Sequence, residues 1–299
     1  MANFRNSNFT FVIFLSLPVQ IKIIMNIKSI LLFGLMVLSI SCKPDSKNMT
    51  EKERAEVKES SVPEPKPKAV MSPFYKQLTT DYCMGKFEPK GDPDFVQIPV
   101  KYADRAGLYL RKDVFDAYKK MYEAALNAGV SLKIRSATRN FNYQKGIWER
   151  KWNGTTRLSD GTNVATDIKS PKKKALKILE YSSMPGTSRH HWGTDIDLNA
   201  FTNSYFEKGE GKKIYNWLSH HAADYGFCQP YSPKGPNRPN GYNEEKWHWT
   251  YLPLSNEITN YAEQHLNNEM ITGFLGAETA SEIDVVSNYV LGINPSCRN

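Results

Sequence analysis

The chain has 299 residues, of which 40% are apolar and 23% charged, and its formal net charge is +8. These proportions are ordinary for a globular protein that buries a core, with room for one large domain or two small ones. The positive charge would suit a nucleic acid, an anionic membrane or an acidic polymer. No long basic run with interleaved aromatic residues occurs, so we expect no nucleic-acid partner.

The first 42 residues are typical of an export leader rather than of a folded domain. They contain two apolar stretches, and both are shorter than a comfortable membrane span. The second stretch follows Met25 and a lysine and ends in small residues before Cys42, which is the order of parts in a secretory signal. A cysteine at this place resembles a bacterial lipoprotein box, although Ser39 stands where leucine is usual. We therefore expect a true start at Met25, a lipidated Cys42 and an exported protein that is lipid-anchored in the bacterial cell envelope.

Residues 43–72 are rich in Lys, Glu, Ser and Pro and contain almost no bulky apolar side chain. Such a segment buries too little apolar surface to offset the entropy of ordering its backbone. We predict a flexible tether over this range, followed by one domain over residues 73–299. The domain is expected to end in a helical C-terminal extension that begins at about residue 253.

The pattern of apolar residues in the domain predicts helices and short strands in chain order. Residues 114–125 repeat at helical spacing ahead of Gly129, and residues 132–136 alternate as a strand does. The next helix is predicted to turn three side chains inward: Tyr143, Ile147 and Trp148. Residues 153–169 are polar and contain glycine, which predicts a surface loop.

The second half of the domain begins with Ser170 and Pro171, which are typical of the cap and the first residue of a helix. The buried positions of this helix are predicted to be Ala175, Ile178 and Leu179. Residues 194–198 alternate, so that Ile196 and Leu198 share one face of a strand and two aspartates the other.

Residues 214–225 predict a further helix that ends at Gly226, and residues 246–251 predict a strand. The apolar face of that strand would hold Trp247, Trp249 and Tyr251. Helices that flank several short strands without regular strand–helix alternation predict an α+β fold. We expect a small antiparallel sheet, flanked by helices, that carries the functional site.

Two clusters of polar residues predict a metal site. Zinc in a hydrolase takes three protein ligands from histidine and carboxylate and keeps a fourth position open. His190, Asp197 and His248 supply such a set, since Asp197 and His248 lie on the polar faces of two predicted strands. Glu245 is expected at the entry of its strand, where the backbone can turn its carboxylate toward the metal as a general base.

The order of these residues resembles a known family. The pattern Ser-x-His-x-x-Gly-x-x-x-Asp, which starts at Ser188, is followed by Glu-x-Trp-His, which ends at His248. It resembles the D-alanyl-D-alanine carboxypeptidases and dipeptidases of the VanY type, which share a zinc site with lysostaphin-like enzymes and hedgehog domains. The resemblance spans residues 107–251 and implies that the three metal ligands bind Zn²⁺ and that Glu245 is the catalytic carboxylate.

The resemblance also implies roles for residues that bind the substrate. The family's Ser-x-x-Arg segment and its glutamine correspond to 136–139 and Gln144. Arg139 would hold the substrate carboxylate or stabilise the oxyanion, and Ser188 would hydrogen-bond the terminal carboxylate of the substrate. The chain departs from the family at Asp195, where alanine is more frequent, and this places an additional negative charge near the metal.

The expected function is therefore zinc-dependent D,D-carboxypeptidase activity on the C-terminal D-Ala-D-Ala-type bond of peptidoglycan stem peptides. An endopeptidase or a dipeptidase of the same family is the nearer alternative. A non-catalytic, zinc-stabilised module that binds cell wall is the alternative of another class, and the presence of Glu245 argues against it because a structural zinc site needs no base.

Three cysteines remain once Cys42 is assigned to a lipid. An exported protein can use a cysteine near its C-terminus to fasten its tail. We therefore predict a disulfide between Cys228 and Cys297 with Cys83 free, and three reduced, buried thiols are the alternative.

Overall fold

The structure is a computed structural model that describes residues 72–298. The predicted leader, the lipidation of Cys42 and nearly all of the predicted tether lie outside the described residues. Within residues 72–298, no helix combines the length and the apolar composition that are required to cross a membrane.

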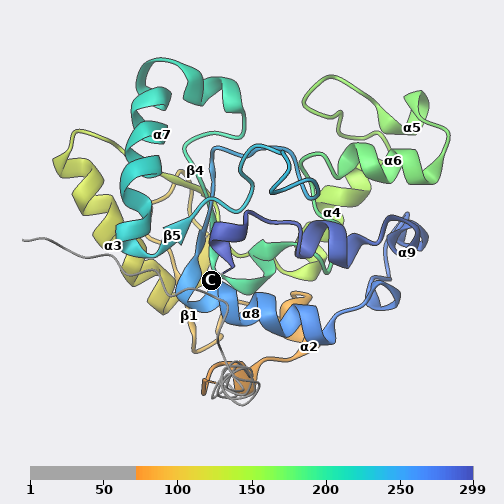
Figure 1. The fold of residues 1–299 in the computed structure, drawn as a ribbon, viewed down its shortest axis with the longest axis horizontal. Coiled ribbons are helices and arrows are strands. Elements are labelled where there is room, and N and C mark those ends of the chain that lie inside the picture. The colour runs from red at the N-terminus through yellow and green to blue at the C-terminus, as the bar shows by residue number, and fades with distance from the viewer. Residues whose placement is uncertain (1–71, 299) are drawn as a thin grey trace, which may run out of the picture. The chain divides into compact units, whose positions relative to one another are not determined.

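Four short strands form an antiparallel sheet in the order β3-β4-β6-β5 (Figure 1). Their bounds are β3 (Ile134–Ser136), β4 (Asp195–Leu198), β6 (His248–Tyr251) and β5 (Phe227–Cys228). A separate antiparallel pair consists of β1 (Phe95–Gln97) and β2 (Tyr109–Arg111). Helices lie on both sides of the four-stranded sheet, so the structure confirms the α+β prediction.

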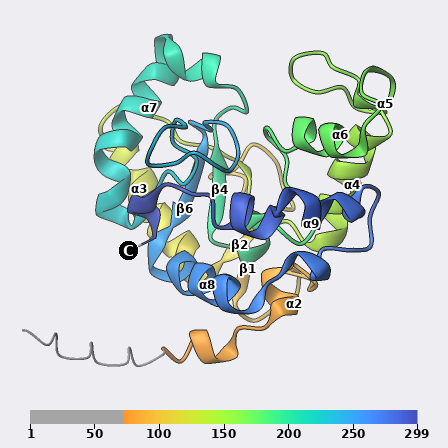
Figure 2. The ribbon, with the colours of Figure 1, turned by 45° about the vertical axis from the view of Figure 1, so that its right-hand side comes forward.

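One face of the sheet is apolar and carries two helices, α3 (Lys112–Asn127) and α7 (Gly209–His221), which Figures 1 and 2 show on the same side. Ile196, Leu198 and Trp249 pack into this core, as the alternation of their strands predicts. Each fully buried side chain of this size contributes about 1.5–3 kcal/mol relative to its exposed state. The opposite face of the same strands is left for polar residues.

A second group of helices lies on the other side of the sheet (Figures 1 and 2): α4 (Phe141–Trp152), α5 (Val164–Asp167) and α6 (Pro171–Ile178). Ser170 caps α6 by accepting a hydrogen bond from the backbone of Lys173, so the predicted start of this helix is confirmed. The prediction of which α4 side chains are buried is partly wrong. Gln144 and Trp148, one turn apart, are buried, whereas Tyr143 is 56% exposed. The predicted loop 153–169 also contains α5.

The tail packs back on the domain. It contains α8 (Leu252–His265), α9 (Ala280–Ile283) and several single turns. α8 ends at His265 because Leu266 is extended, and Asn267 then caps the next turn. Ile258, Val285 and Val290 are fully buried in one core with Trp148 of α4. The same core includes Cys83, the last residue of α2 (Thr80–Cys83), which is buried and free.

A disulfide joins Cys228 of β5 to Cys297, with 5.8 Å between the two Cα atoms. It links the edge of the sheet to the end of the described chain across a separation of 69 residues. Closing a loop of this length restricts the unfolded chain, and chain-entropy models give about 4 kcal/mol of stabilisation.

We predict that replacing both cysteines with serine lowers the free energy of unfolding by up to about 4 kcal/mol. Urea denaturation of the wild type and of the Cys228→Ser/Cys297→Ser variant measures the difference. Alkylation of the unreduced, unfolded wild type should label Cys83 but neither Cys228 nor Cys297. Labelling of Cys228 or Cys297, or coincident unfolding midpoints, would contradict the bridge.

Candidate metal centre and substrate pocket

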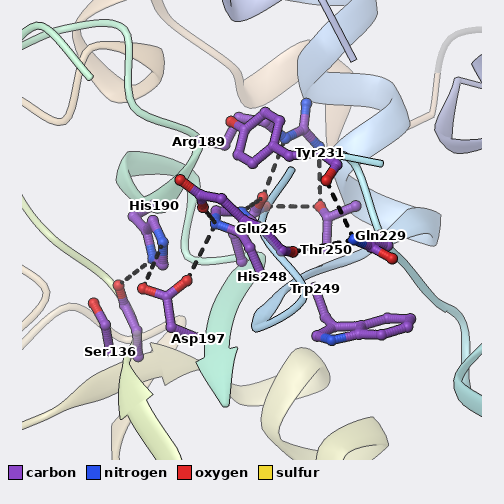
Figure 3. Close-up of polar contacts among 12 residues, drawn as sticks. Ser136, Arg189, His190, Asp197, Gln229, Tyr231, Glu245, His248, Trp249 and Thr250 are labelled. Carbon is purple, nitrogen blue, oxygen red and sulfur yellow. Dashed lines mark hydrogen bonds and ion pairs between the residues drawn. The ribbon is translucent and has the colours of Figure 1, made fainter. Parts of the chain in front are cut away.

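Three side chains converge on the polar face of the sheet. His190 is held on a 3₁₀ turn, Arg189–Trp192, which Gly193 ends with a φ of 72°. Asp197 of β4 is directly paired with His248 of β6, so their side chains leave the sheet side by side. Figure 3 shows the two histidines and the aspartate turned toward one another.

The distances suit a shared metal ion. Nε2 of His190 lies 3.2 Å from Oδ2 of Asp197, and Nδ1 of His248 lies 3.2 Å from Oδ1 of Asp197. One ligand atom from each residue lies within 4.8 Å of the others, and all three residues are buried. Apart from these contacts within the set, Nε2 of His190 and Oδ1 of Asp197 are buried with no hydrogen-bond partner among residues 72–298. Two imidazoles and one carboxylate with unused ligand atoms therefore fit a metal ion of the zinc type.

The protonation state of His190 also favours metal binding. Its Nδ1 lies 2.8 Å from the carbonyl oxygen of Ala137, which can only accept, so Nδ1 carries the proton and Nε2 keeps its lone pair. Burial and the nearby Arg139 lower the pKa of His190. Both effects favour the neutral imidazole that a metal requires.

Glu245 lies at the entry of β6, as expected from the sequence. The backbone N–H of His248 donates to the carbonyl oxygen of Glu245 at 3.2 Å, and this turn brings the carboxylate back to the ring, with Oε2 3.3 Å from Nδ1 of His248. Burial raises the pKa of Glu245, while His248 opposes the shift. A buried carboxylate with a raised pKa beside a metal site is suited to accept and return a proton.

The metal residues form the floor of a pocket of about 500 Å³ that also holds Arg139, Gln144 and Ser188. Oγ of Ser188 and Oε1 of Gln144 are buried and have no hydrogen-bond partner in the described part of the chain. Nη1 of Arg139 donates to Oγ of Ser136 at 2.8 Å and lies 3.6 Å from Oδ2 of Asp197. The structure thus brings every site residue predicted around the metal into one cavity and leaves polar atoms there available to a ligand.

His191, at a variable position of the motif, is a structural residue. The backbone N–H of Gly186 donates to its Nε2 at 3.0 Å, and its Nδ1 donates to the carbonyl oxygen of Arg139 at 2.6 Å. Burial lowers the pKa of His191 to about 3, so the ring stays neutral. These two bonds fix the backbone that presents Arg139 to the pocket.

Lys151 is a pocket residue that the motifs did not reveal. Its Nζ donates to Oγ of Ser182, and burial, followed by the charge of Arg139, lowers the pKa of Lys151 to about 8. Gln144 and Lys151 are seven residues apart, which is two turns of α4. Helical spacing from Gln144 could therefore have identified this lysine from the sequence.

The predicted loop after α4 contributes one wall of the pocket, through residues 158–160. Nζ of Lys177 lies 2.8 Å from Oδ2 of Asp160 and 2.8 Å from Oε2 of Glu180. These two carboxylates at the pocket are therefore already paired. Arg139 and Lys151 also line the pocket, where Arg139 lies 3.6 Å from Asp197 and Lys151 donates to Ser182.

The environment of Asp195 differs from the one that the sequence suggested. Its side chain is fully buried behind the metal residues, and both of its oxygens accept hydrogen bonds. Burial acts to raise the pKa of Asp195, but Arg189 and His248 hold it below its usual range. The expected additional negative charge is thus compensated by Arg189, and Asp195 is not placed to serve as an alternative base.

A glutamate beside two histidines and a carboxylate, in a pocket on an α+β scaffold, defines a metallopeptidase. Residues 107–254 match the family model described as VanY, D-alanyl-D-alanine carboxypeptidase. The chain therefore belongs to the VanY family, as its motifs indicated.

Two curated relatives carry carboxypeptidase names. The putative carboxypeptidase YodJ of Bacillus subtilis is 27% identical over 177 residues, which are 56% of this chain and 55% of the relative. The D-alanyl-D-alanine carboxypeptidase of Enterococcus faecalis is 29% identical over 154 residues, which are 50% of this chain and 52% of the relative. The chain thus spans about half the length of the curated relatives it matches.

Solved structures of VanY proteins are similar as well. VanYB in complex with D-alanine-D-alanine is 22% identical, with a TM-score of 0.43 over 60% of this chain and 87% of that chain. A variant of the VanY D,D-pentapeptidase from the VanB-type resistance cassette, in complex with Zn(II), is 24% identical, with a TM-score of 0.40 over 55% of this chain and 88% of that chain.

Proposed function

We propose that the chain is a zinc-dependent D,D-carboxypeptidase that removes the last residue from peptidoglycan peptides ending in D-Ala-D-Ala. The observation that carries this proposal is the placement of Glu245 beside the three metal-binding residues, in a pocket that also presents Arg139 and Lys151. Family membership supports it independently, through the match over residues 107–254.

The residues of the site divide the chemistry among them. His190, Asp197 and His248 would hold the zinc, which when bound lowers the pKa of a coordinated water and polarises a carbonyl group. Glu245 takes a proton from the attacking water and returns it to the leaving amine. Arg139 neutralises negative charge that develops on the substrate oxygen or holds the terminal carboxylate.

The charges of the pocket support a substrate with a free C-terminus. Arg139 and Lys151 line the cavity and bring positive charge to it, whereas Asp160 and Glu180 are paired with Lys177. Charge-assisted hydrogen bonds to a carboxylate are among the strongest that proteins form. The unpartnered hydroxyl of Ser188 offers a further donor to the same group.

We predict that Arg139→Lys reduces kcat/KM for a peptide with a free C-terminus by about tenfold or more. Lysine keeps the charge but loses the planar fork that binds a carboxylate through two parallel bonds. The measurement compares free and amidated D-Ala-D-Ala peptides with both proteins. Equal cleavage of the two peptides by the wild type would show that no terminal carboxylate is recognised, and it would favour the endopeptidase alternative.

We predict a pH-dependent KM that originates at Lys151. The pKa of this lysine is about 8, so its side chain is positively charged below that pH and loses the charge as the pH rises through it. Loss of a charge-assisted bond worth about 1.5–3 kcal/mol raises KM about five- to tenfold between pH 7 and pH 9. Lys151→Met should show a raised KM at pH 7 and no further rise of KM between pH 7 and pH 9. If KM of this variant still rises over that range, Lys151 is not the source of the pH dependence.

Residues 158–160 line the same pocket, and we propose that this segment closes it beyond the leaving residue, as an exopeptidase requires. We also propose that a lipid anchor at Cys42 holds the protein at the cell envelope. The support for this location is the signal-like order of residues that ends at Cys42. Palmitate labelling that is lost in Cys42→Ala tests it.

A further inference from the structure

A buried polar network lies directly behind the third metal-binding residue. Oδ2 of Asp195 accepts from Nε2 of His248 at 2.8 Å and from Nε of Arg189 at 3.1 Å. Oδ1 accepts from the hydroxyl groups of Thr194 and Thr250, both at 2.7 Å. Every member of this set is buried in the structure, and the side chains of Asp195 and Arg189 have no exposed surface.

Arg189 is itself held on three sides. Nη1 donates to Oγ1 of Thr259 on α8 at 3.0 Å, and Nη2 donates to Oγ1 of Thr250 at 2.9 Å. Its guanidinium lies 4.3 Å from the ring centroid of Trp192. Because the guanidinium is fixed, the carboxylate of Asp195 is fixed with it, and the two charges compensate each other.

The two nitrogens of His248 face different partners. Nδ1 faces Asp197 and Glu245, whereas Nε2 faces Asp195 (Figure 3 shows the ring with Arg189 and Thr250). Carboxylates face both nitrogens, and when a metal ion binds Nδ1 the one ring proton that remains is on Nε2, where Asp195 accepts it.

We propose that Asp195 and Arg189 form a positioning pair that fixes the ring of His248 for zinc binding. This inference rests on the proposed zinc-dependent function. A hydrogen-bond partner of this kind sets the tautomer and the orientation of a metal-binding histidine, and its loss costs about 10–100-fold in metal affinity. Through Thr259, the pair also ties the metal centre to the first helix of the tail.

The test is the zinc affinity of three variants, measured by competition with a chelator of known affinity. Asp195→Asn keeps the size of the side chain but leaves Arg189 without its counter-charge, and it should bind zinc about 10–100-fold more weakly than the wild type. The double variant Arg189→Met/Asp195→Asn removes both charges and keeps an acceptor for Nε2. It should recover part of the lost affinity, which a loss of fold would not.

Thr259→Val is the matched control. It deletes a bond to Arg189 but leaves the contact between Asp195 and His248 intact, so its zinc affinity should stay close to that of the wild type. The visible spectrum of the Co²⁺-loaded proteins reports ligand geometry independently of turnover, and it should change in Asp195→Asn but not in Thr259→Val.

The outcomes separate this inference from the proposed function. Zinc affinity and a Co²⁺ spectrum in Asp195→Asn that match those of a zinc-binding, active wild type would overturn the positioning pair and leave the function standing. A wild type that binds no zinc would overturn both. Weakened binding in Asp195→Asn, with recovery in the double variant, supports the pair.

Discussion

Replacing Glu245 with glutamine is expected to reduce kcat by about 10²–10⁴-fold while the protein keeps its zinc. Glutamine preserves the shape of the side chain but cannot accept the proton of the attacking water. The buried position of Glu245 beside His248, and the raised pKa that follows from burial, suit it to this step. Steady-state hydrolysis and metal analysis of the same preparation provide both readouts.

Glu244→Gln is the matched control because it removes the neighbouring carboxylate without touching the pocket. It should retain the turnover of the wild type. Near-normal turnover in Glu245→Gln would place the base elsewhere. Asp195 would not be the replacement, because both of its oxygens are engaged behind the metal residues.

Replacing His190 or His248 with alanine is expected to abolish both zinc binding and activity. The wild type should contain about one zinc per chain, as a catalytic site with three protein ligands requires. Removing a ligand should lower zinc affinity by more than the roughly 100-fold that marks the loss of a supporting hydrogen bond. Metal analysis after dialysis against a weak chelator measures the loss.

His221→Ala tests whether any histidine substitution has this effect. His221 is exposed on α7 and does not line the pocket, and its Nδ1 lies 3.6 Å from Oδ2 of Asp224. Its variant should keep full zinc and full activity. Full zinc retention in His190→Ala would instead remove this residue from the metal site.

The faces of the two central strands could be predicted from the sequence because strand periodicity is local. Ile196 and Leu198 alternate with the aspartates on β4, and Trp249 alternates with His248 on β6. When hydrophobic residues occupy one face of a short strand, the side chains between them lie on the other face. The antiparallel pairing of β4 with β6 then brings Asp197 and His248 together.

The environment of the site could not be predicted in the same way, since it depends on contacts between distant parts of the chain. Arg189 reaches Thr259, which is 70 positions away, and it also donates to Asp195. From the sequence alone, Asp195 could only be counted as a charge near the metal. The helix of Lys151 was predicted, but its contact with Ser182 depends on the turn that follows α6.

Hydrolysis of a short peptide ending in D-Ala-D-Ala, assayed with and without a chelator, tests the central claim most directly. The account predicts release of free D-alanine by the purified protein, loss of that activity on chelation and its return when zinc is added. A zinc-loaded, folded protein that releases no D-alanine, or one whose activity survives complete removal of the metal, would contradict it.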